Sequence, residues 1–483
     1  MENPFENMRL ALVVISFMVG FAGAAQNYHA VQGSPYAGSL GMMNNPATML
    51  NTPIKWDVTV IGFQLKSATN IYTIYDYSLL SNPANSAYGL NKGDFARKAA
   101  LSFNTNLFNT RITLNRRQAI GFGANIRGLL RAKTSPYYFI DSIKSSRDFF
   151  ELNSAGRTYS AKITGSNWIE LFGSYARTIL DMEQGRLNTA ITLKVSRGIG
   201  GAHVSAENIR FRTEPLGNSR FSVLSDARLT YGYSSNFDRW QKQKAGNENV
   251  RNLVAYTEGG ASMDLGLEYF IKTQAVTSFE DDDDYYDYKW RIGISLLDIG
   301  VNQYKYGTES RTVSGMKAGI TDTLLDDKFR TVNSLGDVND SLATIVQNIS
   351  SLAGKFTVIN PMRLVINADR PLADDFYING EVSINLAGVF KKYHSVNEMN
   401  FITITPRWEK RSLGAYLPVQ YNAEGKFWIG GAFKAGPLLL GVHNWANVFG
   451  KKSMQNGGGY IAIVIRAWTN TKNKTDPRLN CPE

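Results

Sequence analysis

Stretches in which neighbouring side chains differ in polarity run along most of this chain, and they restrict its fold more than any other feature. Between residues 55 and 468 they read as strands with a period of two, roughly 9 to 15 residues long, the length that a tilted strand needs to cross a bilayer. The first expected strand is 56–64. The others are 100–114, 118–131, 169–180, 187–198, 220–233, 262–272, 289–304, 362–369, 376–386, 400–410, 414–422, 426–434, 438–448 and 460–468.

Such strands predict an all-β protein, a transmembrane antiparallel β-barrel. Only a closed barrel lets side chains face lipid and lumen in turn while every backbone group is hydrogen-bonded. After the N-terminal segment, no run approaches the roughly 18 apolar residues of a spanning helix. The single Cys, Cys481, excludes a disulfide framework, and whether it is a spare thiol or bridges two molecules stays open.

Turn lengths predict the orientation of the barrel. Tight connectors at 115–118, 181–185, 371–375 and 436–437 alternate with long polar loops near 77–97, 133–160, 235–259 and 305–360. In outer-membrane barrels the short turns face the periplasm and the long loops face outward. The count is 16 strands if 204–212 is one of them, and 14 without it and one further segment.

The N-terminal residues are typical of an export signal. An apolar run from Leu10 to Ala22 follows Arg9 and precedes small residues, with a cleavage site after Ala24 or Ala25. We therefore expect a signal peptide at 1–25, a segment 26–54 before the first strand, a barrel at 55–468 and a polar periplasmic tail at 469–483. An N-terminal anchor helix is the alternative, and the outer membrane is the expected location.

The formal net charge of +11 would indicate nucleic acid in a cytoplasmic protein, but behind an export signal it does not. We expect these charges in solvated loops, where basic groups near the rim can meet outer-membrane lipid and the phosphates of lipopolysaccharide. In the last long loop, Leu342, Ile345, Ile349 and Leu352 have helical spacing. They predict a helix over 337–352, capped by Asp337 or Asn339 and covering the barrel mouth, with an irregular loop as the alternative.

The segment before the first strand carries the most specific motif. The run 38–47, Gly-Ser-Leu-Gly-Met-Met-Asn-Asn-Pro-Ala, ends in Asn45-Pro46-Ala47. Pro46 fixes its own φ and favours an extended Asn45, and the small residues allow close packing. Two structures stay open: a hatch inside the lumen that shapes a ligand site, or a cap over the periplasmic opening.

On this motif, on Leu297-Asp298-Ile299-Gly300 at the end of a mid-barrel strand, and on the strand rhythm, the chain resembles the FadL family of long-chain fatty-acid transporters. It is similar also to the shuttle barrel of the type IX secretion system. The runs 404–409, 415–419 and 436–441 look closest to an uncharacterised FadL-like group from Bacteroidota. The resemblance implies a lumen hatch at 26–54, with Gly41, Asn45, Pro46 and Ala47 at the ligand-facing lumen.

Residues for catalysis or metal binding have no recognisable spacing. The four histidines, His29, His203, His394 and His443, form no metal-ligand pattern, and His443-Asn444 reads as a rim pair, so neither metal nor cofactor nor enzyme activity is expected. Asp281, Asp282, Asp283 and Asp284 form an acidic run in a periplasmic connector. It reads as a solvated stretch first, a protein-docking patch second, and a calcium site last.

Two functions follow. The first is a FadL-like barrel that transports a hydrophobic small molecule across the outer membrane. The alternative is a scaffold barrel whose loops or acidic turn dock secreted or membrane proteins. An apolar lumen beside the hatch would favour transport, and a plugged lumen with large apolar loop patches would favour docking.

Overall fold

The computed structural model describes residues 28–78, 82, 86–153, 156–216, 219–241, 243–273, 286–373, 375–389, 393–422, 426–448 and 450–467. The expected signal peptide, the acidic run 281–284 and the tail 469–483 with Cys481 lie outside these residues. The fold is a closed antiparallel barrel of 14 strands. Within the described residues, no helix is both long and apolar enough to cross a membrane.

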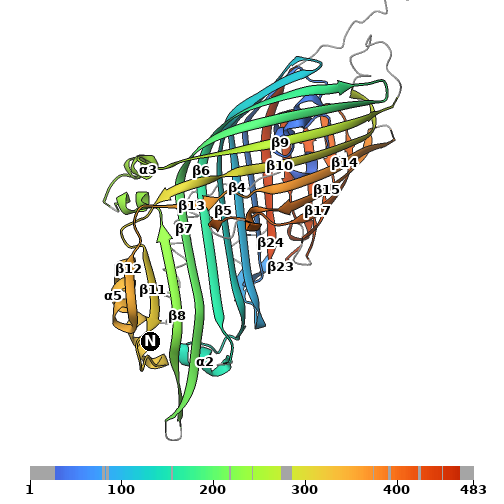
Figure 1. Ribbon diagram of the computed structural model, residues 1–483. Coiled ribbons are helices and arrows are strands. Elements are labelled where there is room, and N and C mark those ends of the chain that lie inside the picture. Colours follow the sequence, from blue (N-terminus) through green and yellow to red (C-terminus); the bar gives the residue numbers. More distant parts are fainter. Residues whose placement is uncertain are drawn as a thin grey trace, which may run out of the picture.

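The barrel wall follows the chain from strand to strand (Figure 1). Its strands are β1(Trp56–Thr69), β4(Gly93–Asn115), β5(Gln118–Phe139), β6(Tyr159–Asp181), β7(Gly185–Leu216), β9(Gly259–Lys272), β10(Tyr288–Lys305), β13(Lys355–Ile359) with β14(Arg363–Ala373), β15(Phe376–Asn385), β17(Phe401–Glu409), β18(Leu413–Tyr416) with β19(Val419–Asn422), β20(Phe427–Ile429) with β21(Gly431–Ala435), β22(Leu438–Val442) and β24(Asn456–Arg466). β1 pairs antiparallel with both β4 and β24, which closes the barrel.

The count of 14 strands is confirmed, and the structure shows which two segments are not separate wall strands. Residues 204–212 are the outer part of the 32-residue strand β7 and not a separate strand. β7 pairs with β9 only as far as Arg197, and from Ala202 onward it pairs with β8(Ser219–Tyr233). The segment 220–233 is therefore β8, which lies outside the barrel wall.

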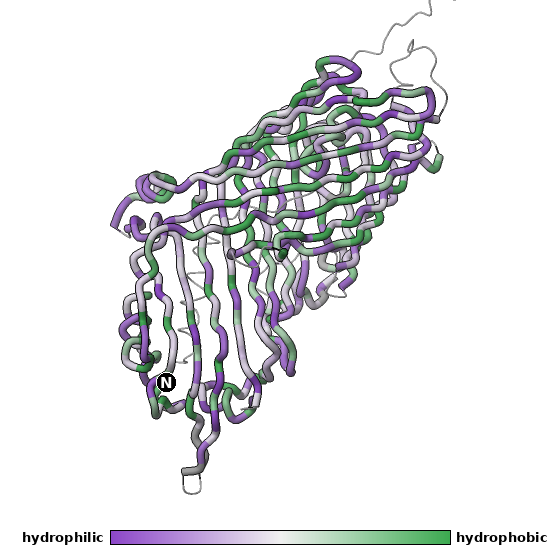
Figure 2. The backbone as a smooth tube through the Cα atoms, viewed as in Figure 1, coloured by the Kyte–Doolittle hydropathy of each residue, from purple (hydrophilic) through white to green (hydrophobic). Residues whose placement is uncertain are grey.

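The polarity of the wall strands is inverted relative to a soluble protein. On β7, Leu193 and Val195 are 60% and 62% exposed, while Thr192 and Lys194 between them are each 3% exposed. Figure 2 shows hydrophobic and hydrophilic residues alternating along the wall strands. An apolar outer face around a polar lumen is the pattern of a barrel whose solvent is lipid. The location in the outer membrane predicted from the sequence is confirmed.

The sheet of the wall continues on its outer side through further strands, and we call this part with its helices the extension. β8 pairs with β11(Arg311–Met316), and β11 pairs with β12(Val346–Ser351). The helices here are α2(Ser146–Leu152), α4(Asp322–Phe329) and α5(Leu335–Ile345). The extension has an apolar core of its own, built from Tyr231, Val313, Met316, Ile320, Leu342, Ile345 and Val346.

The loop helix predicted over 337–352 is correct only in its first half. α5 ends at Ile345, and Ile349 lies in strand β12. The N-cap is Ser334, whose side chain accepts the Asp337 N–H in a capping box, and not Asp337 or Asn339. α5 packs on the sheet of the extension and does not cover the barrel mouth (Figure 1). The helical spacing of Leu and Ile in the sequence continues past Val346, but the chain changes from helix to strand there. Val346 is β-branched and is buried in the core of the extension, which favours the strand.

Smaller elements lie at the outer end of the barrel. β2(Tyr72–Tyr77), β3(Ala87–Leu90) and β23(Lys452–Met454) form a separate sheet. The remaining elements are η5(Ser235–Arg239), α3(Gly246–Val254), η7(Ala387–Val389), β16(His394–Ser395) and η8(Trp445–Asn447).

Candidate functional site: the hatch and the outer pocket

Residues 28–54 fold inside the barrel, and we call them the hatch. They form three short 3-10 helices, η1(His29–Val31), η2(Gly38–Met43) and η3(Pro46–Leu50). In Figure 1 this dark-blue segment is enclosed by the wall strands. Gly41, Asn45, Pro46 and Ala47 are all buried. A lumen segment, and not a cap over the opening, is therefore the arrangement that the structure describes for these residues.

The Asn45-Pro46-Ala47 motif starts η3. Asn45 is extended, with φ −151° and ψ 108°, and its Oδ1 accepts the Ala47 N–H at 3.0 Å, so Asn45 caps the helix that Pro46 opens. The same side chain donates from Nδ2 to the Leu267 carbonyl of β9 at 3.0 Å. One asparagine thus ends the extended chain, starts the helix and attaches it to the wall.

A glycine in the wall makes room for this motif. A Cβ at Gly266 of β9 would lie 2.3 Å from Asn45 Oδ1 and 2.9 Å from Pro46 Cδ. Within the hatch, a Cβ at Gly41 would lie 2.9 Å from the Ala37 Cβ. Both glycines permit approaches that a side chain would block.

Hydrogen bonds to the polar lumen and apolar packing both attach the hatch to the wall. Ser34 Oγ donates to Glu409 at 2.7 Å, Asn44 Nδ2 to Glu381 at 2.8 Å, and Asn51 Nδ2 to Glu268 at 2.8 Å. Ser39 Oγ and Thr59 Oγ1 are 2.8 Å apart. Two apolar clusters also join hatch and wall. Met42, Met49 and Leu50 pack on one part of the wall, and Tyr28, Val31 and Leu40 pack on another. The hatch can therefore leave its place only if water replaces the polar partners and both apolar surfaces separate.

Above the hatch, a cluster of buried charges crosses the lumen. Arg127 of β5 donates to both Asp298 oxygens at 2.7 Å, and Lys194 of β7 donates to Asp298 Oδ1 at 2.7 Å. Lys194 also pairs with Asp264 at 2.7 Å, and Arg127 with Glu170 at 3.2 Å. We call these five residues the Asp298 cluster.

The Asp298 cluster depends on an irregular backbone. Asp298 has φ +58°, in the left-handed region that side chains rarely adopt. The register of β10 against β9 shifts between Leu296 and Ile299, so the extra residues form a bulge that turns Asp298 into the lumen. Leu297-Asp298-Ile299-Gly300 thus lies in the middle of β10 and not at its end, as the sequence had led us to expect.

The positions along β10 give the order of layers through the lumen. Ser295 donates to the Asn44 carbonyl of the hatch at 2.6 Å. Asp298 follows in its cluster, and Tyr304 then packs in an aromatic cluster with Leu129, Trp168, Phe356, Val358 and Val396. The lumen is therefore filled from the periplasmic side by hatch, ion pairs and aromatic rings in that order.

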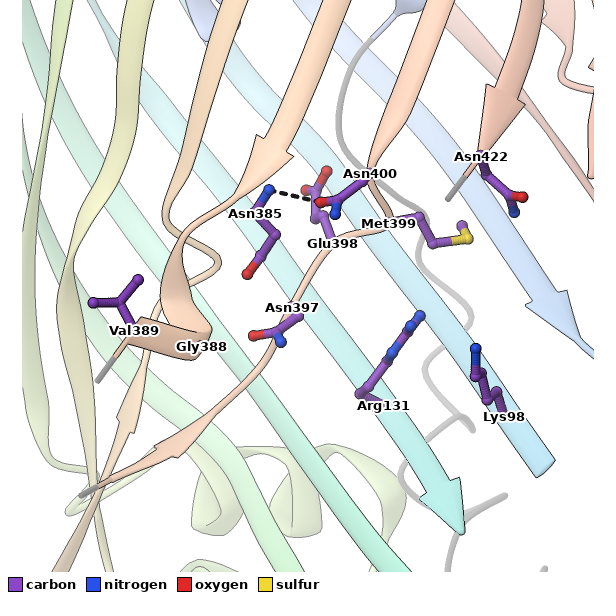
Figure 3. Close-up of a pocket in the computed structure, with 10 residues that line it drawn as sticks. All are labelled: Lys98, Arg131, Asn385, Gly388, Val389, Asn397, Glu398, Met399, Asn400 and Asn422. Carbon is purple, nitrogen blue, oxygen red and sulfur yellow. Dashed lines mark hydrogen bonds between the residues drawn. The ribbon is translucent and has the colours of Figure 1, made fainter. Parts of the chain in front are cut away.

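A pocket of about 420 Å³ lies at the outer end of the lumen (Figure 3). One side is the wall, with Lys98 on β4 and Arg131 on β5. The other side is the segment 393–400, which we call the mouth segment and which contributes Asn397, Glu398, Met399 and Asn400. Asn385, Gly388, Val389 and Asn422 complete the lining. Polar groups of both charges face this space, while Met399 also belongs to a buried cluster with Phe401 and Trp428.

A line of paired residues joins the pocket to the hatch. Glu398 of the pocket accepts from Arg363 Nη1 at 3.0 Å, and Arg363 in turn acts electrostatically on Glu381. Glu381 holds Asn44 of the hatch at 2.8 Å. A molecule that displaced Glu398 from Arg363 would therefore change the charge next to the hatch.

The structure describes some of the site residues predicted from the sequence and not others. Gly41, Asn45, Pro46 and Ala47 come together in the lumen, whereas Asp281–Asp284 lie outside the described residues. His443 lies within 3.2 Å of Gln64 and next to the Tyr460 ring, and Asn444 caps η8. Sequence reasoning missed the pocket residues and the charged partners of Asp298. The signal for the latter was present in the Asp of the Leu-Asp-Ile-Gly motif and in Lys194 between apolar neighbours.

The described residues match a known sequence family over most of their length. A family model described as a family of unknown function (DUF5723) matches residues 46–442. The chain belongs to this family. The match begins at Pro46 of the hatch motif and includes all lining residues of the pocket. No curated protein sequence matches this DUF5723 chain.

Three of the solved structures to which this DUF5723 chain is similar come from different bacteria. A Pseudomonas aeruginosa FadL homologue has a TM-score of 0.40 and 10% identity, covering 92% of this chain and 99% of that chain. The Ralstonia pickettii toluene transporter TbuX has a TM-score of 0.38 and 11% identity, covering 92% and 100%. The P. putida toluene transporter TodX has a TM-score of 0.38 and 10% identity, covering 89% and 93%. These neighbours belong to the FadL group that the sequence resembles.

Proposed function

We propose that this chain is an outer-membrane transport barrel that admits a small, partly hydrophobic molecule at its outer pocket and passes it after the hatch moves. The observation that carries the proposal is the position of the pocket, at the outer end of a lumen whose inner part the hatch occupies. Its volume of about 420 Å³ lies within the roughly 300–1,000 Å³ of small-molecule sites. No catalytic step is part of the proposal.

The lining favours a molecule with both an apolar and a polar part. Lys98, Arg131 and the asparagines offer donors to polar groups, whereas Met399 leads to the apolar cluster around Trp428. Between the pocket and the hatch, the Asp298 cluster places charged side chains from five neighbouring wall strands in the lumen. A molecule with polar groups can exchange hydrogen bonds with these side chains as it passes, which a molecule without them cannot do.

A scaffold function is the second candidate, and the extension favours it. The extension folds around its own apolar core outside the barrel wall, and so presents a stable surface away from the membrane. The two candidates differ in what each needs: transport needs the pocket, and docking needs only the extension.

Mass spectrometry of material purified gently from native membranes tests the choice. We expect a small molecule bound in about one copy per barrel, lost in the variants Lys98→Gln and Arg131→Gln. Arg210→Gln, in the exposed outer part of β7, is the matched control and keeps the molecule. An empty barrel that carries a protein partner, lost on changes in the extension, would refute transport and support the scaffold.

A further inference from the structure

Two histidines from distant parts of the sequence stack at the inner end of the mouth segment. The rings of His203 on β7 and His394 on β16 are 3.7 Å apart between centroids and inclined by 17°. His394 is the second residue of the mouth segment. Two residues after it, the Val396 N–H donates to the Ile359 carbonyl. The same short segment thus touches the histidine of β7 at one end and lines the pocket at the other.

The surroundings of the pair favour uncharged rings. Phe356 of β13 lies 5.2 Å from His203 between centroids, Tyr306 directly after β10 lies 5.9 Å away, and β8 meets the ring at Gly232. Neither nitrogen of His203 has a hydrogen-bond partner among the described residues. The charged side chain that acts on both rings is Lys162 of β6, which disfavours a second positive charge. Two imidazolium rings at this distance would repel each other as well.

We propose that the His203–His394 stack is an acid-sensitive latch that holds the mouth segment over the pocket at neutral pH and releases it as the pH falls. The inference rests on the proposed function, because it concerns access to that pocket. The evidence for the latch itself is the geometry of the stacked rings. Opening separates the rings, exposes both to water and removes the conflict between their charges.

The direction of the effect follows from the two ionisations. His203 lies beyond Arg197, where β7 stops pairing with β9, and His394 lies in the two-residue strand β16 in the connection between β15 and β17, so neither is in a membrane-spanning segment. Burial, together with the neighbouring His394 and Lys162, lowers the pKa of His203 to about 3. Burial and Lys162 lower the pKa of His394 to about 4. Protonation therefore favours the open form, whose rings titrate near the ordinary value of about 6.5.

These values give a magnitude. Between pH 7.5 and 5.5, one imidazole that is protonated only in the open form raises the opening equilibrium about 10-fold, and two raise it about 100-fold. The latch is closed above pH 6.5 or so, and opening grows steadily below that value.

Hydrogen exchange of the full-length barrel in detergent tests the latch without any ligand. After correction for the intrinsic pH dependence of exchange, we expect the amides of 393–400, Val396 above all, to open about 100-fold more at pH 5.5 than at pH 7.5. His203→Phe and His394→Phe keep an aromatic ring and should each reduce the change to about 10-fold, and the double variant should abolish it. His443→Gln, which removes a buried histidine elsewhere, should leave it at about 100-fold.

A wild-type segment whose corrected exchange does not change with pH would overturn the latch, whether or not the variants fold. A double variant that folds and still shows the full change would do so too. Because the readout is exchange and not uptake, these results are separate from a failure to find a bound molecule.

Discussion

The lumen and the extension bury opposite kinds of side chain within one chain. In the lumen, the buried residues are Arg127, Asp298 and their partners, and the apolar side chains of the same strands face outward. In the extension, Tyr231, Leu342 and Ile345 are buried, and the polar residues face outward. β7 takes part in both, since its inner half belongs to the wall and its outer half carries β8. The surrounding medium, lipid or water, decides which side chains are buried.

The comparison also shows where stability and movement are located. Charges buried in the lumen are stable only as complete sets, because one missing partner leaves an unpaired charge in a low dielectric. Apolar residues of the extension contribute more independently, each by the area it buries. The hatch combines both kinds of contact, since it makes hydrogen bonds to buried carboxylates and packs on the wall through two apolar clusters.

Removing a charge from the lumen should have the largest effect. Asp298→Ala leaves Arg127 and Lys194 without their shared partner and should lower the free energy of unfolding by about 3–5 kcal/mol. Denaturant titration of the barrel in lipid or detergent measures this loss. Asp327→Ala, which removes an exposed acid of the extension paired with Arg330, is the control and should cost less than about 0.5 kcal/mol. Equal losses of unfolding free energy in the two variants would contradict the difference between lumen and extension.

Removing an apolar group from the extension should have a smaller and local effect. Leu342 is 8% exposed, so Leu342→Ala should cost about 2–3 kcal/mol, near the lower end for buried leucines. Faster hydrogen exchange in α5, β11 and β12 with unchanged exchange in β4 to β6 would show that the extension is a separate unit. Asp340→Ala, on an exposed position of the same helix, should change neither. Loosening of the whole wall would contradict the separation.

The smallest effect is expected in the hatch. Asn45→Ala removes the cap of η3 and the bond to the Leu267 carbonyl, and should cost about 1–2 kcal/mol of local stability. We expect faster exchange of residues 45–51 without a change in the denaturation midpoint of the barrel. Asn333→Ala, an exposed asparagine of the extension, is the matched control. Cooperative loss of the barrel in N45A would mean that the hatch supports the wall.

The barrel was predictable from sequence because the membrane imposes a period of two over many strands. One position such as Lys194 carries little information, but its alternation with Leu193 and Val195 is repeated around the wall. The count was ambiguous at 204–212, and 220–233 was predicted as a wall strand, because a strand that leaves the barrel keeps the same backbone pattern. Wall and extension differ in the strand with which β7 pairs, β9 for its inner half and β8 for its outer half. The sequence of β7 alone does not show which strand it pairs with.

The site was predictable only where local chemistry determines it. Pro46 restricts the backbone, so the extended Asn45 followed from the sequence, whereas the short helix that Asn45 caps did not. The pocket combines Lys98, Arg131 and the mouth segment, which are far apart in the chain and carry no shared pattern. The stack of His203 on His394 was equally hidden, because neither histidine has a neighbour in sequence that marks it. Sequence spacing thus detects motifs within one segment and misses sites assembled across the barrel.

The central claim is that the hatch must leave its place for the barrel to conduct, and a reversible lock tests it most directly. Ser39 Oγ and Thr59 Oγ1 are 2.8 Å apart, so Ser39→Cys with Thr59→Cys, in a Cys481→Ser background, should form a disulfide between hatch and wall. Current carried by KCl across planar bilayers is the measurement. We predict a silent barrel when the disulfide is formed and transient openings after reduction, with wild type unaffected by the reductant. Equal currents in the oxidised and reduced states, or silence in both, would contradict the account.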